Sequence, residues 1–294
     1  MYYNLRQDCY IYPNKKPPYK KVCIGMRGQY GDFIMQEPGL REFIRNNPDT
    51  KIVLGISKKF EDIMPLFYNY HKNIIEFKVF EGYGDWPTIS DEEYIKSQNF
   101  DAIFPNGKPI HQQPDWAKYK HITIETALMM GMSARTAKIN LNMPENVKKE
   151  SKTACIHMFS SKYPGGVRSI SIEKQTEITN YLIERGYKVY QLSAPHQPRI
   201  EGAIYKEGSY YDACIRMLST DFLVSCDSGM LFVSSGYDHP TLGLFSTAYN
   251  PLVTTTKNWQ PINPNATYME SYWADNLDIN LITNELDNLI RSTT

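Results

Sequence analysis

One stretch, residues 221–245, constrains the fold more than any other part of the chain. It begins with the apolar run Phe-Leu-Val-Ser-Cys at 222–226, which predicts a buried strand, and the polar sequence Asp-Ser-Gly at 227–229 ends that run. A short helix is predicted at 230–235 and a second buried strand at 241–245. This order is typical of an open α/β sheet, in which ligands bind at the carboxyl ends of the strands. The polar turn either binds an anion such as phosphate at the start of the helix, or merely caps that helix.

The same alternation of strands and helices runs through the rest of the chain in two blocks. Strands are predicted at 21–26, 51–56, 74–80, 101–104, 153–159, 187–192 and 203–205. Helices are predicted at 32–45, 60–68, 121–130, 171–185, 210–218 and 278–291, whereas residues 246–277 show little periodicity. A charged segment, 144–152, reads as a linker between the blocks. The pattern predicts an α/β protein with two Rossmann-like domains, 1–145 and 146–294, facing each other across a cleft. The terminal helix 278–291 is expected to return toward the first domain.

The composition narrows the functional classes. The chain has 294 residues, of which 41% are hydrophobic and 22% charged, so a folded protein of two ordinary domains is expected. Basic and acidic residues both number 32, and this zero net charge argues against a globally basic nucleic-acid binder. Five cysteines without a Cys-x-x-Cys pair argue against a zinc site or a disulfide framework. The N-terminus does not resemble a signal peptide and no apolar run could span a membrane, so a cytoplasmic protein is expected.

A glycine-containing turn follows the first predicted strand. Gly25, Gly28 and Gly31 are spaced differently from the Gly-x-Gly-x-x-Gly fingerprint of dinucleotide enzymes. The second strand ends in Ser-Lys-Lys at 57–59, without the acidic residue that would hold a ribose, so a nicotinamide cofactor is disfavoured. Asp32 stands at the start of the next helix. It is either a partner of the helix dipole or, at the mouth of the predicted cleft, a general base.

A polar loop, 160–168, follows the first strand of the second block. The loop could bind a diphosphate through the hydroxyls of Ser160 and Ser161, its glycines and the cation Arg168. An ordinary surface loop has the same composition. No Asp-x-Asp occurs in the chain and the six histidines show no metal-ligand spacing, so no metal site is predicted. His157, within a strand, and His239, before a proline, are interpreted as structural.

Together these motifs resemble glycosyltransferase family 9, the heptosyltransferase-like enzymes of the two-domain GT-B fold. The first match is Arg27-x-x-x-Gly31-Asp32-x-Ile34-x-x-x-Pro38-x-Leu40-Arg41, continued by Asn47-Pro48-Asp49. The second match is Asp227-Ser228-Gly229, continued by Pro240-Thr241-x-Gly243-Leu244-Phe245. The resemblance covers most of residues 21–250 and is thin between 80 and 150. The family usually has histidine three residues after the glycine of the second match, where this chain has Phe232.

The resemblance implies an inverting, metal-independent transfer of a sugar from a nucleotide-diphosphate sugar, with no cofactor. Asp32 matches the family's catalytic base, and Arg27 and Gly31 beside it are candidates for binding an acceptor or an anion. The donor diphosphate would be bound by Ser160, Ser161, Arg168, Asp227, Ser228 and Gly229.

The identity of the acceptor stays open at this point. A glycan or lipopolysaccharide-type acceptor is the default of the resembled family. DNA with a modified base is an alternative acceptor, because the lysines of segment 14–21 and Lys58-Lys59 could contact phosphates. A protein of a different class, which binds nucleotide sugars without catalysis, would keep the 227–229 turn but would not depend on Asp32.

Overall fold

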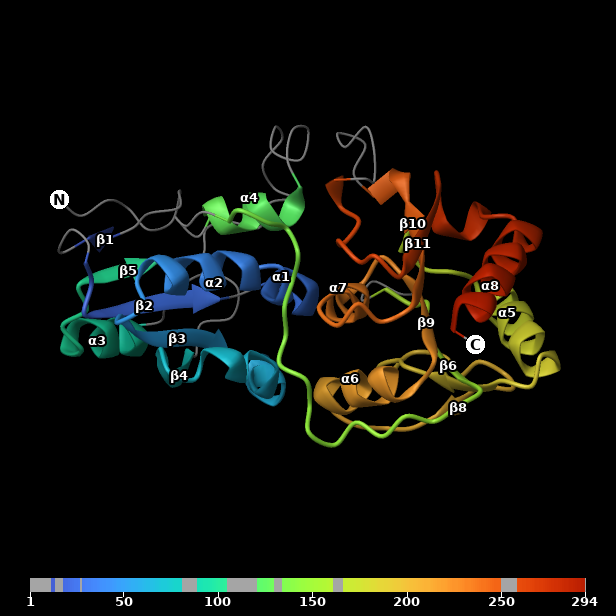
Figure 1. Ribbon diagram of the computed structural model, residues 1–294, viewed down its shortest axis with the longest axis horizontal. Coiled ribbons are helices and arrows are strands. Elements are labelled where there is room, and N and C mark those ends of the chain that lie inside the picture. The colour runs from blue at the N-terminus through green and yellow to red at the C-terminus, as the bar shows by residue number, and fades with distance from the viewer. Residues whose placement is uncertain are drawn as a thin grey trace. The chain divides into compact units, whose positions relative to one another are not determined.

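The computed structural model describes residues 12–13, 18–26, 28–80, 89–104, 121–129, 134–160, 166–249 and 258–293. The chain divides into two compact units, Met1–Asn142 and Met143–Thr294, each built on its own sheet (Figure 1). The sequence pattern had placed this division after residue 145. Among the described residues, no helix is long and apolar enough to cross a membrane.

The sheet of the first unit has five strands in the order β1-β5-β2-β3-β4, of which β1 alone is antiparallel to its neighbour. Its strands are β1 (Tyr12–Pro13), β2 (Lys21–Met26), β3 (Lys51–Ser57), β4 (Ile74–Phe80) and β5 (Ala102–Phe104). Its helices are α1 (Tyr30–Ile34), α2 (Glu37–Asn46), the 3₁₀ helix η1 (Lys58–Tyr70), α3 (Ile89–Ser97) and α4 (Ile122–Met129). The rings of Phe33, Phe60 and Phe67 meet where α1 packs on η1, with the first two centroids 4.3 Å apart.

The sheet of the second unit has six strands, all parallel, in the order β11-β10-β9-β6-β7-β8. Its strands are β6 (Thr153–His157), β7 (Lys188–Gln191), β8 (Ile204–Tyr205), β9 (Phe222–Cys226), β10 (Thr241–Ser246) and β11 (Ala266–Ser271). Its helices are α5 (Ile172–Glu184), α6 (Tyr210–Ser219), α7 (Gly229–Ser235), α8 (Ile279–Thr293) and the short 3₁₀ helices η4 (Thr247–Tyr249) and η6 (Ala274–Asn276). Central strands β6, β9 and β10 are buried almost throughout, as expected for a parallel sheet covered on both faces.

The structure refines several of the predicted elements. The helix expected at 32–45 is two helices, because α2 starts afresh at Glu37 and places Pro38 in its first turn, where a missing N–H is tolerated. The helix expected at 60–68 is the 3₁₀ helix η1, which contains Pro65. The edge strand β11 was not predicted, because it lies half-exposed at the margin of the sheet and its sequence lacks a continuous apolar run.

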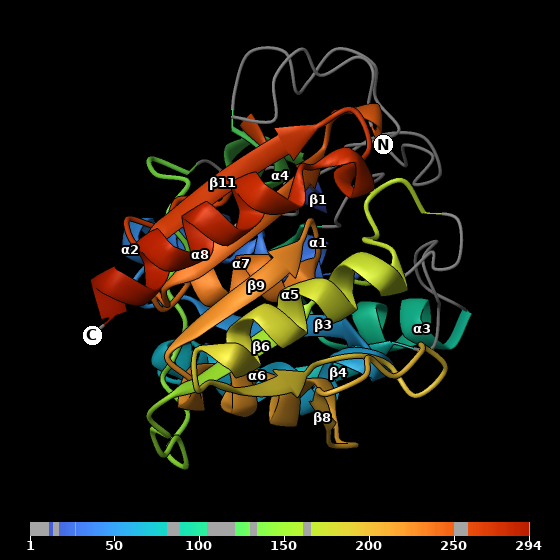
Figure 2. The ribbon, with the colours of Figure 1, turned by 90° about the vertical axis from the view of Figure 1, so that its right-hand side faces the viewer.

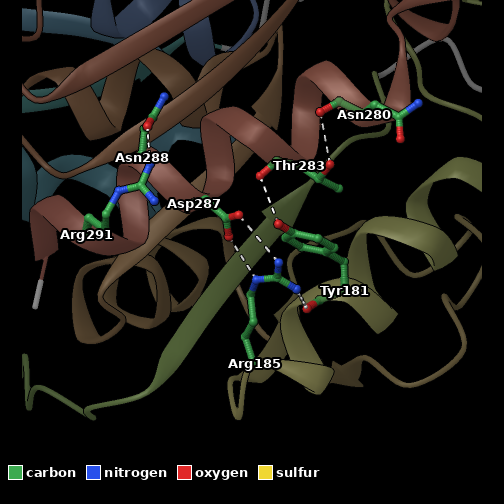
Figure 3. Close-up of polar contacts among 7 residues, drawn as sticks. All are labelled: Tyr181, Arg185, Asn280, Thr283, Asp287, Asn288 and Arg291. Carbon is green, nitrogen blue, oxygen red and sulfur yellow. Dashed lines mark hydrogen bonds and ion pairs between the residues drawn. The ribbon is translucent and has the colours of Figure 1, made fainter.

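The terminal helix α8 packs within the second unit, where it buries Ile282, Leu286 and Leu289 in the core. Figure 2 shows α8 beside α5 on one face of the second sheet. Polar contacts tie the two helices together: Arg185 Nε lies 2.9 Å from Asp287 Oδ1, and the Tyr181 hydroxyl donates to the Thr283 carbonyl (Figure 3). The periodicity of α8 predicted an amphipathic helix correctly but could not tell which apolar surface would receive it.

Candidate active site

The second unit brings most of the predicted site residues to one edge of its sheet. Strands β6 and β9 are neighbours in parallel register, with His157 opposite Ser225. The segments that follow them therefore leave the sheet at the same edge, and they carry Ser160 after β6 and Asp227 after β9. This carboxyl edge is where parallel α/β sheets bind ligands.

An ion pair joins the two predicted loops at this edge. Arg168 Nη1 lies 3.5 Å from Asp227 Oδ2, and the exposed fractions of the two side chains are 17% and 9%. A carboxylate buried to this degree needs a compensating charge, which Arg168 provides. Asp227 in turn fixes the guanidinium at the end of strand β9. An arginine held in this way is pre-oriented for phosphate, because its planar fork of N–H donors matches phosphate oxygens.

Hydroxyl groups flank this ion pair. Ser160 is 2% exposed, and its Oγ lies 3.0 Å from Ser169 Oγ, while its carbonyl accepts a hydrogen bond from the buried Gln197 amide. Ser228 Oγ lies 3.1 Å from Ser225 Oγ. Ser160 and Ser228 thus each have a hydroxyl partner, with which donor and acceptor roles can be exchanged when an anion arrives.

The turn at 227–229 departs from a simple helix cap. Ser228 occupies the N-cap position of α7 with extended backbone, but its side chain makes no capping hydrogen bond. Asp227 is engaged by Arg168, and Gly229 is the first residue of the helix. Phe232 is buried within α7, so the ring that replaces the histidine of the resembled family is a packing residue here.

Asp32 lies in the first unit, on α1. Its Oδ2 accepts a hydrogen bond of 2.8 Å from the Gln29 N–H, and the Gln29 side chain accepts from the Asp32 N–H, so the two residues form a capping box. Gly28 has a φ of +110°, and a Cβ there would lie 2.4 Å from Asp32 Cβ, so only glycine fits beside this carboxylate. Asp32 and Gly31 are half-buried, and the Asp32 carboxylate keeps lone pairs beyond the one that caps the helix. Arg27 and Ser161 lie outside the described residues.

Sequence reasoning missed three residues that shape the second-unit edge: Ser169, Gln197 and Ser225. Ser169 and Ser225 are each next to, or within three residues of, a predicted site residue, and this proximity is the only signal that the sequence offers. Gln197 lies in the loop after β7, and nothing in its local sequence indicates that its amide reaches the Ser160 carbonyl. Such contacts depend on which strands become neighbours.

The two histidines singled out earlier have structural roles. Burial lowers the pKa of His157, whose Nδ1–H donates to the Leu192 carbonyl at the end of β7. Burial also lowers the pKa of His239 to about 3, so its ring stays neutral in the folded protein. Within the part of the chain that the structure describes, no three His, Cys, Asp or Glu side chains are grouped to hold a metal ion.

Comparisons with known proteins identify the fold. No family model and no curated protein matches the sequence. Among solved structures, a glycosyltransferase of family 9 from Veillonella parvula superposes with a TM-score of 0.71 at 15% identity, covering 95% of this chain and 99% of the other. An ADP-heptose lipopolysaccharide heptosyltransferase II from E. coli gives a TM-score of 0.68 at 12% identity, covering 93% and 99%. The E. coli heptosyltransferase WaaC, solved with ADP, gives 0.64 at 14% identity, covering 92% and 99%. This chain therefore has the GT-B fold of the family 9 glycosyltransferase structures.

Proposed function

We propose that this protein is an inverting glycosyltransferase that moves a sugar from a nucleotide-diphosphate donor to a hydroxyl acceptor. The observation that carries the proposal is the Arg168–Asp227 ion pair at the carboxyl edge of the second sheet, with Ser160 and Ser228 beside it. The GT-B fold, shared with a family 9 glycosyltransferase structure, supports this assignment. The fold alone names no function, so the argument rests on the chemistry of the site.

The donor diphosphate would bind at this edge of the second unit. Arg168 would contact the phosphate oxygens, and the Ser160 and Ser228 hydroxyls would donate hydrogen bonds to them. As the bond between the anomeric carbon and the phosphate oxygen breaks, negative charge collects on the departing nucleoside diphosphate. A guanidinium held by Asp227 stabilises this charge without having to reorganise during the reaction. In this proposal the arginine, rather than a divalent cation, stabilises the departing diphosphate.

Asp32 would act as the general base. The acceptor oxygen attacks the anomeric carbon from the face opposite the leaving diphosphate, its proton passes to the Asp32 carboxylate, and the configuration of the sugar inverts. The capping box with Gln29 would orient the carboxylate, and Gly28 leaves room for it. Gly31, in the same turn, and Arg27 are the candidates for contacting the acceptor or an anion on it.

The donor is best sought first among adenine nucleotides, because the similar E. coli enzyme WaaC was solved with ADP and with an ADP-linked fluoro-heptose. Phe232 gives a reason to extend the search beyond heptose, since a buried phenyl ring cannot donate or accept the hydrogen bonds of an imidazole. A glycan or lipopolysaccharide-type acceptor is the class that this proposal favours.

The test is a mass-spectrometric screen of the intact protein against ADP-, UDP-, GDP- and dTDP-sugars, first for binding and then for transfer to glycan acceptors. We expect the unsubstituted protein to bind the sugars of one nucleotide family. We expect Arg168→Ala to bind them with lower affinity. Arg185→Ala is the matched control, because Arg185 also forms an ion pair in the second unit but lies at the C-terminal end of α5. Binding of no nucleotide sugar, or equal binding by both variants, would refute the donor site. Binding without transfer to any acceptor would favour the non-catalytic alternative.

A further inference from the structure

The helix that carries Asp32 is interrupted two residues after Ile34. Helix α1 ends at Ile34 and α2 begins at Glu37, with Pro38 in the first turn of α2. Proline has no N–H, and its ring clashes with the carbonyl of the residue four positions earlier, so a continuous helix through Pro38 is disfavoured. The carbonyls in the last turn of α1 therefore need donors other than the N–H groups of a continuing helix.

Gln36 supplies the donor for the carbonyl of Asp32. In a continuous helix the Gln36 N–H would donate to that carbonyl, but here it donates to the Phe33 carbonyl over 3.2 Å. The side-chain amide takes its place, because Gln36 Nε2 lies 2.8 Å from the Asp32 carbonyl oxygen. Gln36 is also the N-cap residue of α2, yet its side chain makes no capping hydrogen bond to that helix. The amide therefore completes the end of α1 rather than the start of α2.

The Gln36 side chain is fully buried beneath the turn that carries Asp32. Its exposed fraction is 0%, and burial of an amide is unfavourable unless the amide is hydrogen-bonded. On the side-chain end of Asp32, the Gln29 N–H donates to Oδ2 over 2.8 Å. Asp32 is thus held twice, at its carboxylate by Gln29 and at its carbonyl by Gln36, which leaves it few alternative orientations.

We propose that Gln36 is a positioning residue, which fixes the direction of the Asp32 carboxylate by holding the backbone at the helix break. This inference rests on the proposed function, since it assigns a support to the proposed base. A general base must lie within about 2.6–3.2 Å of the atom whose proton it removes. A displacement of about 1 Å can lower a rate about 10²-fold. The bond from Gln36 goes to the backbone of Asp32, so its effect reaches the reaction through that residue.

The experiment is a double-mutant cycle on the full chain with Gln36→Met and Asp32→Asn. Methionine keeps the length of the side chain and removes its amide. Turnover is followed as release of nucleoside diphosphate from whichever of the ADP-, UDP-, GDP- and dTDP-sugars the protein binds. We expect Gln36→Met to lower kcat about tenfold to a hundredfold, with donor affinity unchanged because the donor binds in the second unit. In the Asp32→Asn background the same substitution should change kcat by less than about twofold, since the base is already lost.

Two further variants separate positioning from a general loss of structure. Asn47→Leu removes a bond of the same kind, from Asn47 Nδ2 to the Phe43 carbonyl 2.9 Å away at the other end of α2, and should leave kcat unchanged. Gln36→Asn keeps an amide but is one methylene shorter, and should behave as Gln36→Met. Amide hydrogen exchange, which needs no substrate, should be about tenfold faster at Phe33 and Met35 in Gln36→Met. Both N–H groups donate within the Asp32 turn, to the Gln29 and Gly31 carbonyls.

Other results overturn the proposal. Unchanged kcat, or unchanged exchange at Phe33 and Met35, would mean that Gln36 does not hold the turn. An equal fall of kcat with and without the Asp32 carboxylate, or a similar fall in Asn47→Leu, would mean a general structural effect. If Asp32→Asn turns over normally, the proposed base is wrong and Gln36 has no reacting group to position. Failure of the proposed function as a whole has a different signature. The unsubstituted protein would then bind no nucleotide sugar, while exchange at Phe33 and Met35 would still report whether Gln36 holds the turn.

Discussion

The two units contain turns with the same local plan and different electrostatics. In each, a buried parallel strand is followed by a glycine-containing segment and a short helix, with an aspartate at the third position of α1 in the first unit and just before α7 in the second. Asp32 in the first unit is half-buried and accepts a hydrogen bond from the backbone of its own turn. Asp227 in the second unit is nearly buried and pairs with Arg168 from another loop. The two aspartates therefore have different partners: Asp32 contacts the backbone of its own turn, whereas Asp227 holds the guanidinium of Arg168 in place.

The largest expected effect comes from Asp32→Asn. An amide cannot accept the proton of the acceptor, so turnover should fall by about 10²–10⁴-fold. The amide oxygen can still receive the Gln29 N–H, so the melting temperature should change little. The rate of sugar transfer and the melting temperature are measured on the same preparation. Near-normal turnover in a folded variant would break the comparison, because Asp32 would then be only a capping residue.

The next largest effect is expected from Arg168→Ala. The variant loses the phosphate contact and also leaves Asp227 as a buried carboxylate without this partner, a change that costs about 3–5 kcal/mol when a buried pair is broken. Donor affinity should fall at least tenfold, and the melting temperature should fall as well. The double variant Arg168→Ala with Asp227→Ala separates the two effects. It should recover stability without recovering donor affinity, whereas recovery of both would show that the arginine does not contact the donor.

A third prediction concerns Glu37, a carboxyl group buried in the first unit five residues after Asp32. Glu37 is fully buried, receives hydrogen bonds from the Tyr70 hydroxyl and the Asn140 N–H, and has a pKa raised to about 7, chiefly by loss of solvation. A raised folded-state pKa stabilises the fold below the unfolded value of 4.5, and this contribution is lost as pH rises through 7.

The measurement is urea unfolding of the unsubstituted protein and Glu37→Gln at pH 4.5 and pH 7.5. The stability advantage of the unsubstituted protein should shrink by about 3 kcal/mol between the two pH values. The difference between the proteins cancels the opposite contribution of His239, whose lowered pKa makes stability fall below pH 6.5. A constant difference across the pH range would mean that folding leaves the pKa of Glu37 unchanged.

The smallest effect is expected from Ser228→Ala. Its side chain does not cap α7, so loss of the hydroxyl should change stability by less than about 1 kcal/mol. Donor affinity should fall by about threefold to tenfold, corresponding to one hydrogen bond. If the variant loses as much stability as the removal of a helix cap costs and its donor affinity is unchanged, Ser228 only stabilises its helix and does not contact the donor.

The sequence predicted most of the strands and helices in their order, although not β1, α3 and β11, and with them the carboxyl edge where Ser160, Arg168 and Asp227 lie. Periodicity and turn residues are local signals, and they were sufficient for the central strands because those are continuous apolar runs. They were insufficient for β11 and for the packing of α8, because an edge strand is only half-buried and an amphipathic helix does not specify its partner.

The details of the site show the same limit. The pairing of Arg168 with Asp227, the Gln197 contact to Ser160 and the closeness of Gly28 to Asp32 each depend on three-dimensional neighbours. Gly28 could be noticed in part from the sequence, because a glycine stands there four residues before the candidate base. Its positive φ was not visible from the sequence. What it does there became clear only from its distance to the Asp32 side chain.

The most direct test of the account is hydrogen–deuterium exchange of the whole chain with and without a saturating nucleoside diphosphate from the screen. If the second unit alone binds the donor diphosphate, amides in 166–169 and 225–231 should become protected, while those in 28–34 around Asp32 should not change. Protection at 28–34 with none at 166–169 or 225–231 would contradict the account, because the nucleotide would then bind at the turn assigned to the base.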